Sequence, residues 1–168
     1  VRDDVRAYAS VLFADTPEET ASMAREYVDM GLTAVKFGWG PIGPDPDVDV
    51  AHVAAAREAV GWDRDLMVDA GHAWDWETAL GRTELFKPYK IAWLEEPVGQ
   101  DDRKGYAELC KRSEIPIAGG EGDVTHWDFE DLIERGLDIV QPDIAFCGGI
   151  TVCKRVSDMT TAQGRRAV

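Results

Sequence analysis

The chain has 168 residues, of which 45% are hydrophobic and 30% are charged, so it holds enough apolar material for one domain and too little for two. Its 18 lysines and arginines face 32 aspartates and glutamates, which gives a formal net charge of -14. This charge would repel nucleic-acid phosphates and anionic membrane surfaces, so neither is an expected partner.

The three cysteines, Cys110, Cys147 and Cys153, form an odd count without a C-x-x-C pair, which matches neither a secreted disulfide scaffold nor a structural zinc site. We therefore expect a reducing, cytoplasmic location and inert thiols. No apolar run approaches the roughly 18 residues of a membrane helix, and the acidic start differs from a signal peptide. Because the first residue is Val1 rather than Met, we expect the sequence to be part of a longer one.

Short apolar runs alternate along the chain with amphipathic stretches and form six strand–helix units. The runs are nearly continuous in apolar residues, as expected for strands covered on both faces. The predicted strands are residues 6–13, 34–38, 66–71, 91–96, 115–121 and 139–145, and residues 164–168 begin a seventh.

The clearest helix start is Thr16, which forms a capping box with Glu19 around Pro17, and Gly31 ends this helix. The prolines between residues 41 and 46 place that segment in a loop. Further helices are predicted over residues 50–60, from 75 onward, around 106–110, and over 125–135 and 151–162.

This alternation predicts right-handed crossovers and a parallel sheet, either an open doubly wound sheet or a (β/α)₈ barrel. No strand precedes a G-x-G-x-x-G or G-x-x-x-x-G-K-[ST] sequence, so the nucleotide-binding forms of the open sheet lack support. The barrel is favoured. Because a full barrel takes eight units in about 250 residues, the prediction is an α/β fold with about six units of a partial TIM-type barrel.

Four consecutive predicted strands end in acidic residues: Asp69, then Glu95 or Glu96, then Glu121, then Asp143. Active sites of such barrels lie at the carboxyl ends of the strands, so these side chains should stand side by side on the rim. A single acid at such a place commonly caps the following helix or pairs with an arginine. Three in register indicate a metal site instead.

Converging carboxylates repel each other unless a cation neutralises them. All-oxygen ligation without cysteine or a histidine pair favours Mg²⁺ over Zn²⁺. Lys36, at the end of the second predicted strand, could stabilise developing negative charge or take a proton beside a bound carboxylate substrate. His52, His72 and His126 fit structural or surface-loop positions, and most of the six tryptophans fit ordinary packing.

Taken together, these residues resemble the enolase superfamily, specifically the mandelate racemase-like group that contains the acid-sugar dehydratases. The resemblance spans almost the whole chain. The segments that carry it are Ala34-Val35-Lys36, Val68-Asp69-Ala70-Gly71-His72-Ala73-Trp74, Trp93-Leu94-Glu95-Glu96-Pro97, Gly120-Glu121 and Gln141-Pro142-Asp143 followed by Gly148-Gly149.

The resemblance implies that Asp69, Glu95 and Glu121 are the three magnesium ligands. It implies that Asp143 orients the histidine of a His-Asp dyad and that Lys36 is the first lysine of a Lys-x-Lys pair. Gly38 stands where the second lysine, commonly a base, would be. Lys36 is then expected to act as an electrostatic stabiliser, and a two-base racemase is disfavoured.

The implied reaction is abstraction of the proton α to a carboxylate through an enediolate, followed by elimination of the β-hydroxyl. This is the reaction of a Mg²⁺-dependent sugar-acid dehydratase, a hydro-lyase, and the implied full-length form is a homo-oligomer with a small sugar acid as substrate. The alternatives are a racemase, epimerase or cycloisomerase of the same superfamily, or an unrelated metal-dependent lyase or aldolase barrel.

Residues 1–168 are expected to form one incomplete barrel domain, without the N-terminal capping domain and the last strands of such enzymes. The dyad histidine belongs on the seventh strand in this group, and the chain ends at Val168. A further alternative is therefore an inactive fragment, which open sheet edges would make prone to aggregate or oligomerise.

Overall fold

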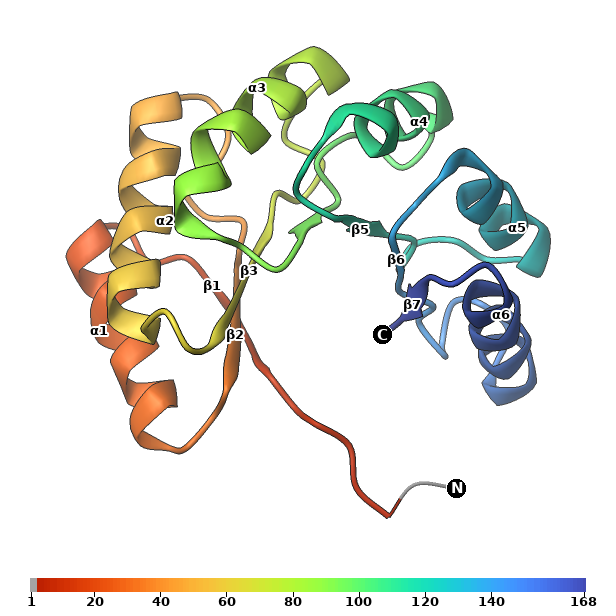
Figure 1. Cartoon of the computed structure of the whole chain (residues 1–168), viewed down its shortest axis with the longest axis horizontal. Coiled ribbons are helices and arrows are strands. Elements are labelled where there is room, and N and C mark those ends of the chain that lie inside the picture. The colour runs from red at the N-terminus through yellow and green to blue at the C-terminus, as the bar shows by residue number, and fades with distance from the viewer. Residues whose placement is uncertain (1–2) are drawn as a thin grey trace.

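The computed structural model describes residues 3–168, which contain seven parallel strands alternating with six α-helices (Figure 1). The strands lie in chain order in one sheet, each hydrogen-bonded to the next. They are β1 (Ala9–Leu12), β2 (Ala34–Gly38), β3 (Asp65–Asp69), β4 (Leu94–Glu95), β5 (Ile117–Gly119), β6 (Ile139–Val140) and β7 (Arg166–Ala167). The predicted α/β class, a partial (β/α)₈ barrel, is confirmed.

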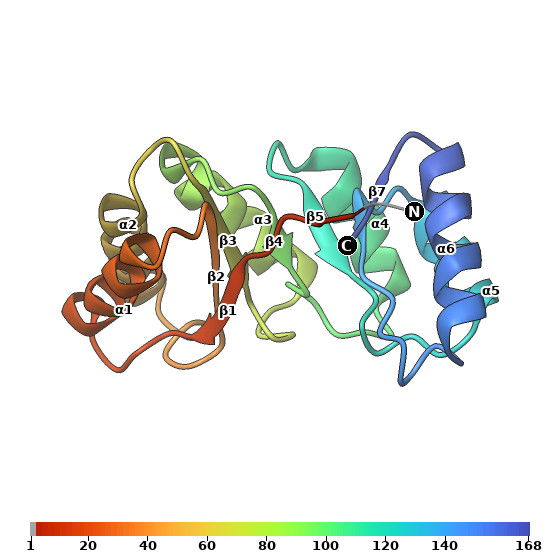
Figure 2. The ribbon, with the colours of Figure 1, turned by 90° about the horizontal axis from the view of Figure 1, so that it is seen from below.

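The helices cover the outer side of the curved sheet, with α1 and α2 at one end and α5 and α6 at the other (Figure 2). They are α1 (Pro17–Asp29), α2 (Pro46–Val60), α3 (Trp76–Phe86), α4 (Arg103–Arg112), α5 (His126–Arg135) and α6 (Ile150–Ala162). Within residues 3–168, none of these helices is long and apolar enough to cross a membrane.

The helix starts follow local sequence chemistry. The predicted capping box at Thr16 is present, since the Thr16 hydroxyl accepts from the Glu19 amide and the Glu19 carboxylate accepts from the Thr16 amide. Thr125 and Asp128 form the same arrangement before α5. These caps satisfy backbone donors that no helical carbonyl can reach.

Helix α2 starts earlier than predicted, at Pro46 rather than near residue 50. The Asp45 side chain accepts from the Asp47 amide at 2.9 Å and caps the helix. Pro46 fits the first helical position because the amide that it lacks would have had no partner there. The assignment of Pro46 to the loop is therefore wrong.

Five strands also end earlier than predicted: β1 by one residue, at Leu12, and β3 to β6 at Asp69, Glu95, Gly119 and Val140. Gly71, Glu96 and Gly120 have positive φ values of 55°, 41° and 104°, which turn the chain out of the sheet. The rim acids consequently lie at the last strand residue or in the loop after it.

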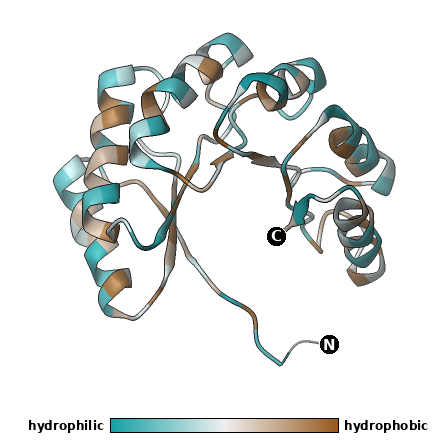
Figure 3. Cartoon of the chain, viewed as in Figure 1, coloured by the Kyte–Doolittle hydropathy of each residue, from teal (hydrophilic) through white to brown (hydrophobic). Residues whose placement is uncertain are grey.

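The sheet separates two apolar layers. The larger layer fills the space between strands and helices and includes the fully buried Phe37, Leu66 and Phe86. A smaller cluster of Ala34, Met67, Trp93, Ala118 and Ile139 lies on the other face. Hydrophobic residues accordingly follow much of the sheet, whereas hydrophilic ones are frequent on the helices (Figure 3). The prediction of strands covered on both faces is confirmed for β2 to β6, whereas β1 and β7 at the ends of the sheet each have exposed residues.

Candidate active site

The candidate site lies at the carboxyl ends of β2, β3 and β4. Asp69 is paired in register with Gly38 of β2 and with Glu95 of β4. Because side chains two residues apart share a face of a strand, Lys36, Asp69 and Glu95 point to the same side as the inner cluster. The structure thus brings Lys36 together with Asp69 and Glu95, two of the three acids that were predicted to converge.

Lys36 lies between the two carboxylates. Its Nζ donates to Glu95 Oε1 and is 3.7 Å from Asp69 Oδ2, and both Lys36 and Glu95 are buried. Burial by itself lowers the pKa of Lys36, but the charge and hydrogen bond of Glu95 and the charge of Asp69 raise the pKa above its ordinary value. The side chain therefore remains an ammonium at neutral pH.

The second oxygen of Glu95 is held by two neutral donors. Trp93 Nε1 donates to Glu95 Oε2 at 2.9 Å, and Gln141 Nε2 donates to the same oxygen at 2.8 Å. Gln141 Oε1 is buried without a hydrogen-bond partner in the described chain. Neither donor was predicted from the sequence, although Gln141 directly follows β6 in the segment that precedes Asp143.

The Asp69 side chain is held by a hydrogen bond from its own loop, and it packs against Gly38 of the neighbouring strand. Its Oδ1 accepts from the Gly71 amide at 2.9 Å. A Cβ on Gly38 would lie 2.8 Å from Asp69 Cβ, so the Asp69 side chain fills the space that a residue 38 side chain would need. Burial and the charge of Glu95 raise the pKa of Asp69, and Lys36 offsets part of that rise.

Glu121 and Asp143 stand on the same rim. Glu121 is exposed two residues beyond β5 and shares a cleft of about 260 Å³ with Lys36 and Asp69. The Asp143 carboxylate accepts from the amides of Ala145 and Phe146 and shares a neighbouring cleft of about 170 Å³ with Glu121. A larger cavity of about 400 Å³, at Arg6 and Asp65, contains none of the four rim acids.

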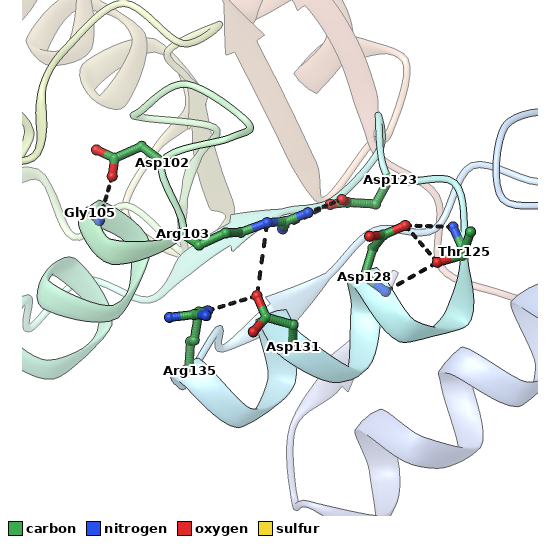
Figure 4. Close-up of polar contacts among 8 residues, drawn as sticks. All are labelled: Asp102, Arg103, Gly105, Asp123, Thr125, Asp128, Asp131 and Arg135. Carbon is green, nitrogen blue, oxygen red and sulfur yellow. Dashed lines mark hydrogen bonds and ion pairs between the residues drawn. The ribbon is translucent and has the colours of Figure 1, made fainter.

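The loop that carries Glu121 is anchored from α4. Arg103 donates to the buried Asp123 carboxylate, two residues after Glu121 (Figure 4). The same guanidinium approaches Asp131 of α5, which also pairs with Arg135. Arg103 therefore ties the β5–α5 loop to both flanking helices.

The structure distinguishes the two acids of the Glu-Glu-Pro segment. Glu95 faces Lys36, whereas the Glu96 carboxylate is 3.1 Å from His72 Nε2. Burial raises the pKa of Glu96 to about 7, and His72 opposes that rise. His72 Nδ1 is 2.8 Å from the Val98 carbonyl, so this histidine joins two rim loops, as its predicted loop position allows.

Trp39 is a rim residue, and it is one of the six tryptophans of which most were expected to serve ordinary packing. Its φ is 57°, it is 55% exposed, and it lines the cleft beside Lys36 and Asp69. A Cβ on Gly71 would lie 2.7 Å from the indole, so the ring covers that glycine. Gly38 and Gly40, on either side of Trp39 in the sequence, were the available signal, because an aromatic residue between glycines at a strand end is free to face the cleft.

The donor chemistry of this rim suits a hard divalent cation. Asp69, Glu95 and Glu121 offer carboxylate oxygens, which Mg²⁺ prefers, and the Lys36 ammonium already lies between two of them. Burial, and after it the charge of Glu95, raise the pKa of Asp69 even though this ammonium opposes the rise, so a further cation would favour the ionised carboxylate. Within residues 3–168, no group of three or more His, Cys, Asp or Glu side chains lies close enough together to hold a metal ion. Thus the residues fit the ion by charge and donor type.

Comparison with known proteins identifies the family. The model of the enolase C-terminal domain-like family matches residues 19–168. The chain is 34% identical over 174 residues to D-galactarolactone cycloisomerase of Agrobacterium fabrum, covering 99% of the chain and 45% of the relative. It is 33% identical over 171 residues to L-talarate/galactarate dehydratase of Salmonella typhimurium, covering 98% and 42% respectively.

Solved structures agree. A predicted mandelate racemase from Rhodobacter sphaeroides superimposes with a TM-score of 0.92 at 40% identity, covering 96% of this chain and 43% of that one. D-glucarate dehydratase from Agrobacterium tumefaciens, complexed with magnesium, superimposes with a TM-score of 0.92 at 30% identity. The match covers 99% of this chain and 47% of that one. The chain spans less than half the length of these relatives. It belongs to the enolase C-terminal domain-like family, among the mandelate racemase-like members of the enolase superfamily.

Proposed function

We propose that this chain supplies the metal-binding half of the site of a Mg²⁺-dependent sugar-acid dehydratase. The observation that carries the proposal is the buried ammonium of Lys36 between Glu95 and Asp69. It matches a site that gathers positive charge around the carboxylate end of a substrate. The relatives include dehydratases for galactarate and arabinonate, which are sugar acids.

In this proposal Asp69, Glu95 and Glu121 hold the ion. When bound, Mg²⁺ supplies positive charge beside the substrate carboxylate and so favours loss of the neighbouring proton. Two solved relatives, a racemase and a glucarate dehydratase, contain magnesium, which supports this choice of ion. Trp93 and Gln141 hold the Glu95 carboxylate in one orientation, and Gly71 holds that of Asp69.

Lys36 acts as an electrostatic stabiliser in the proposed reaction. Its raised pKa keeps the ammonium charged, and a group that holds its proton at neutral pH is a poor base. Gly38 provides no second lysine beside it. Asp143 is proposed to orient a histidine base, since its carboxylate is fixed by the amides of its own turn at the rim.

A cycloisomerase is the second candidate, because a relative with this activity is 34% identical to the chain. Both reactions begin at the carbon next to a carboxylate, and they differ in the product that is released. The proposed partner is a small sugar-acid substrate, and the full-length form is proposed to be a homo-oligomer. We also propose that residues 1–168 form one domain, because one core cluster extends from Phe13 to Val156.

The test is deuterium exchange into galactarate in D₂O with Mg²⁺, followed by NMR, on a full-length protein that contains this chain. A dehydratase is expected to exchange the α-proton and release a 2-keto-3-deoxy acid, and Glu95→Gln should abolish both. Exchange without a dehydration product would reject the dehydratase and favour an epimerase, and release of a cyclised product would favour the cycloisomerase. No exchange by the full-length protein would reject the proposed function, whereas exchange by that protein and none by residues 1–168 alone would favour the inactive-fragment alternative for this chain.

A further inference from the structure

Two of the three cysteines meet beside the Asp143 turn. Cys147, in the turn after β6, and Cys153, in the first turn of α6, place their Sγ atoms 3.2 Å apart. A disulfide requires about 2.05 Å, so the sulfur atoms are little more than one ångström from bonding distance. Cys147 is buried and Cys153 is partly exposed, while Cys110 lies on α4.

The backbone between these cysteines is built to bring them together. Gly148 and Gly149 both have a φ of 98°, a conformation that other residues rarely adopt, and they reverse the chain between the turn and α6. The Cys147 amide donates to the Asp143 carbonyl at 2.8 Å, and the Cys153 amide donates to the Gly149 carbonyl at 3.1 Å. The dithiol is thus fixed to the turn that holds the Asp143 carboxylate.

We propose that Cys147 and Cys153 form an oxidisable dithiol that a low-molecular-weight disulfide such as oxidised glutathione converts into an intramolecular disulfide. The bond would tie the turn that carries Asp143 to α6. The inference does not rest on the proposed function, because no step of disulfide formation uses the metal ligands.

The partly exposed Cys153 reacts first. Its thiolate attacks one sulfur of the glutathione disulfide and expels one glutathione thiolate. The Cys147 thiolate then attacks the Cys153 sulfur of the mixed disulfide and expels the second. Two protein thiols lose two electrons and two protons, and one glutathione disulfide is reduced to two thiols.

The surroundings of Cys153 determine the pH at which this thiol–disulfide exchange proceeds. Burial, the hydrogen bond with Cys147 and the charges of Cys147 and Asp143 raise the pKa of Cys153 to about 11. Because the thiolate is the nucleophile, the first step is expected to accelerate about tenfold per pH unit between pH 7 and pH 9.

The sequence provides a direct assay by mass spectrometry. Trypsin leaves both cysteines on one peptide, residues 136–154, and Cys110 on another, residues 105–111. The whole chain is treated with oxidised glutathione at pH 8.5, alkylated after unfolding and digested. We expect the 136–154 peptide to lose two hydrogens and escape alkylation, with reversal by dithiothreitol, while Cys110 is alkylated.

Three variants sharpen the test. Cys147→Ser should trap one glutathione on Cys153, Cys153→Ser should give no internal disulfide, and Cys110→Ser should behave as wild type. In the wild type, oxidation should raise the midpoint of thermal unfolding, and in Cys147→Ser it should not. Persistent glutathione adducts, disulfides between chains, or full alkylation of the 136–154 peptide in the wild type would overturn the proposal, even if a variant failed to fold.

Discussion

Lys36 is the residue on which the electrostatics of the rim depend. Replacing it by methionine keeps the length of the side chain and leaves the buried Glu95 beside Asp69 without a counter-ion. Because an uncompensated buried charge is costly, Lys36→Met should lower the free energy of unfolding by about 3 kcal/mol. Denaturant titration without added metal measures this loss.

Lys154 offers a matched control, since it pairs with Asp158 on the exposed face of α6. Exposed pairs contribute less than about 1 kcal/mol, so Lys154→Met should change stability little. Equal losses in the two variants would mean that the Lys36 contacts add nothing beyond an ordinary surface pair.

Gly38 controls the position of Asp69. In Gly38→Ala the new Cβ would meet Asp69 Cβ at 2.8 Å, so the carboxylate must move. We expect a loss of about 1–3 kcal/mol in stability and weaker Mg²⁺ binding. Gly81→Ala is the control, because a Cβ there meets nothing within 4 Å and alanine favours helix α3. If Gly38→Ala kept the wild-type affinity for Mg²⁺, the position that Gly38 leaves for the Asp69 carboxylate would not be needed to bind the ion.

His52 should make stability depend on pH. It is buried with its Nδ1 3.0 Å from Thr20 Oγ1, and burial lowers its pKa. The unfolded chain therefore binds a proton at about pH 6.5 while the folded chain does not, so stability falls as the pH drops below that value. His52→Gln should flatten the dependence between pH 7 and pH 5 in thermal unfolding. If the stability of His52→Gln depended on pH as steeply as that of the wild type, groups other than His52 would cause the dependence.

The individual site residues could be predicted from the sequence only where a strand fixes them. Lys36, Asp69 and Glu95 lie on strands, and the period of two sets the face on which each stands. Trp39 and Gln141 lie in loops, where no period tells the direction of a side chain. Their contacts with Gly71 and Glu95 arise from tertiary packing.

Among the elements, α4 and α5 are joined through charges to the loop after β5. Arg103→Met would leave Asp123 buried without its partner, so we expect a loss of about 3 kcal/mol in unfolding free energy. Arg135→Met, which removes a more exposed pair with the same Asp131, should cost less than about 1 kcal/mol. Denaturant titration measures the unfolding free energy of both variants. A larger loss in Arg135→Met than in Arg103→Met would contradict the assignment of Arg103 as the residue that anchors the β5–α5 loop (Figure 4).

The elements themselves were largely predictable, because each strand and helix carries its own period and most helices carry a cap. The strand at 34–38 was predicted with the bounds that it has. The errors lie at the ends of helices and strands, where a single residue determines the boundary. Pro46 starts α2 instead of preceding it, and the positive φ of Glu96 ends β4 at Glu95. Neither depends on hydrophobic pattern.

At the scale of the whole molecule, the sheet order β1 to β7 places the acids of successive strands on one rim. Chain order, short connections and parallel pairing together produce this arrangement, and all three could be predicted from the alternation of apolar runs with helices. The distance between Glu121 and the other acids could not be predicted from the sequence, because it depends on how the β5–α5 loop bends after the positive φ of Gly120.

Calorimetric titration of Mg²⁺ into the purified chain tests the proposed metal site most directly. The comparison is a triple variant, Asp69→Asn, Glu95→Gln and Glu121→Gln, with a charge-matched control of three exposed helical acids, Glu58→Gln, Glu130→Gln and Glu134→Gln. We predict saturable binding in the wild type and the control and none in the site variant. Equal binding by all three, or no binding by a folded wild-type chain, would contradict the assignment of these acids as magnesium ligands.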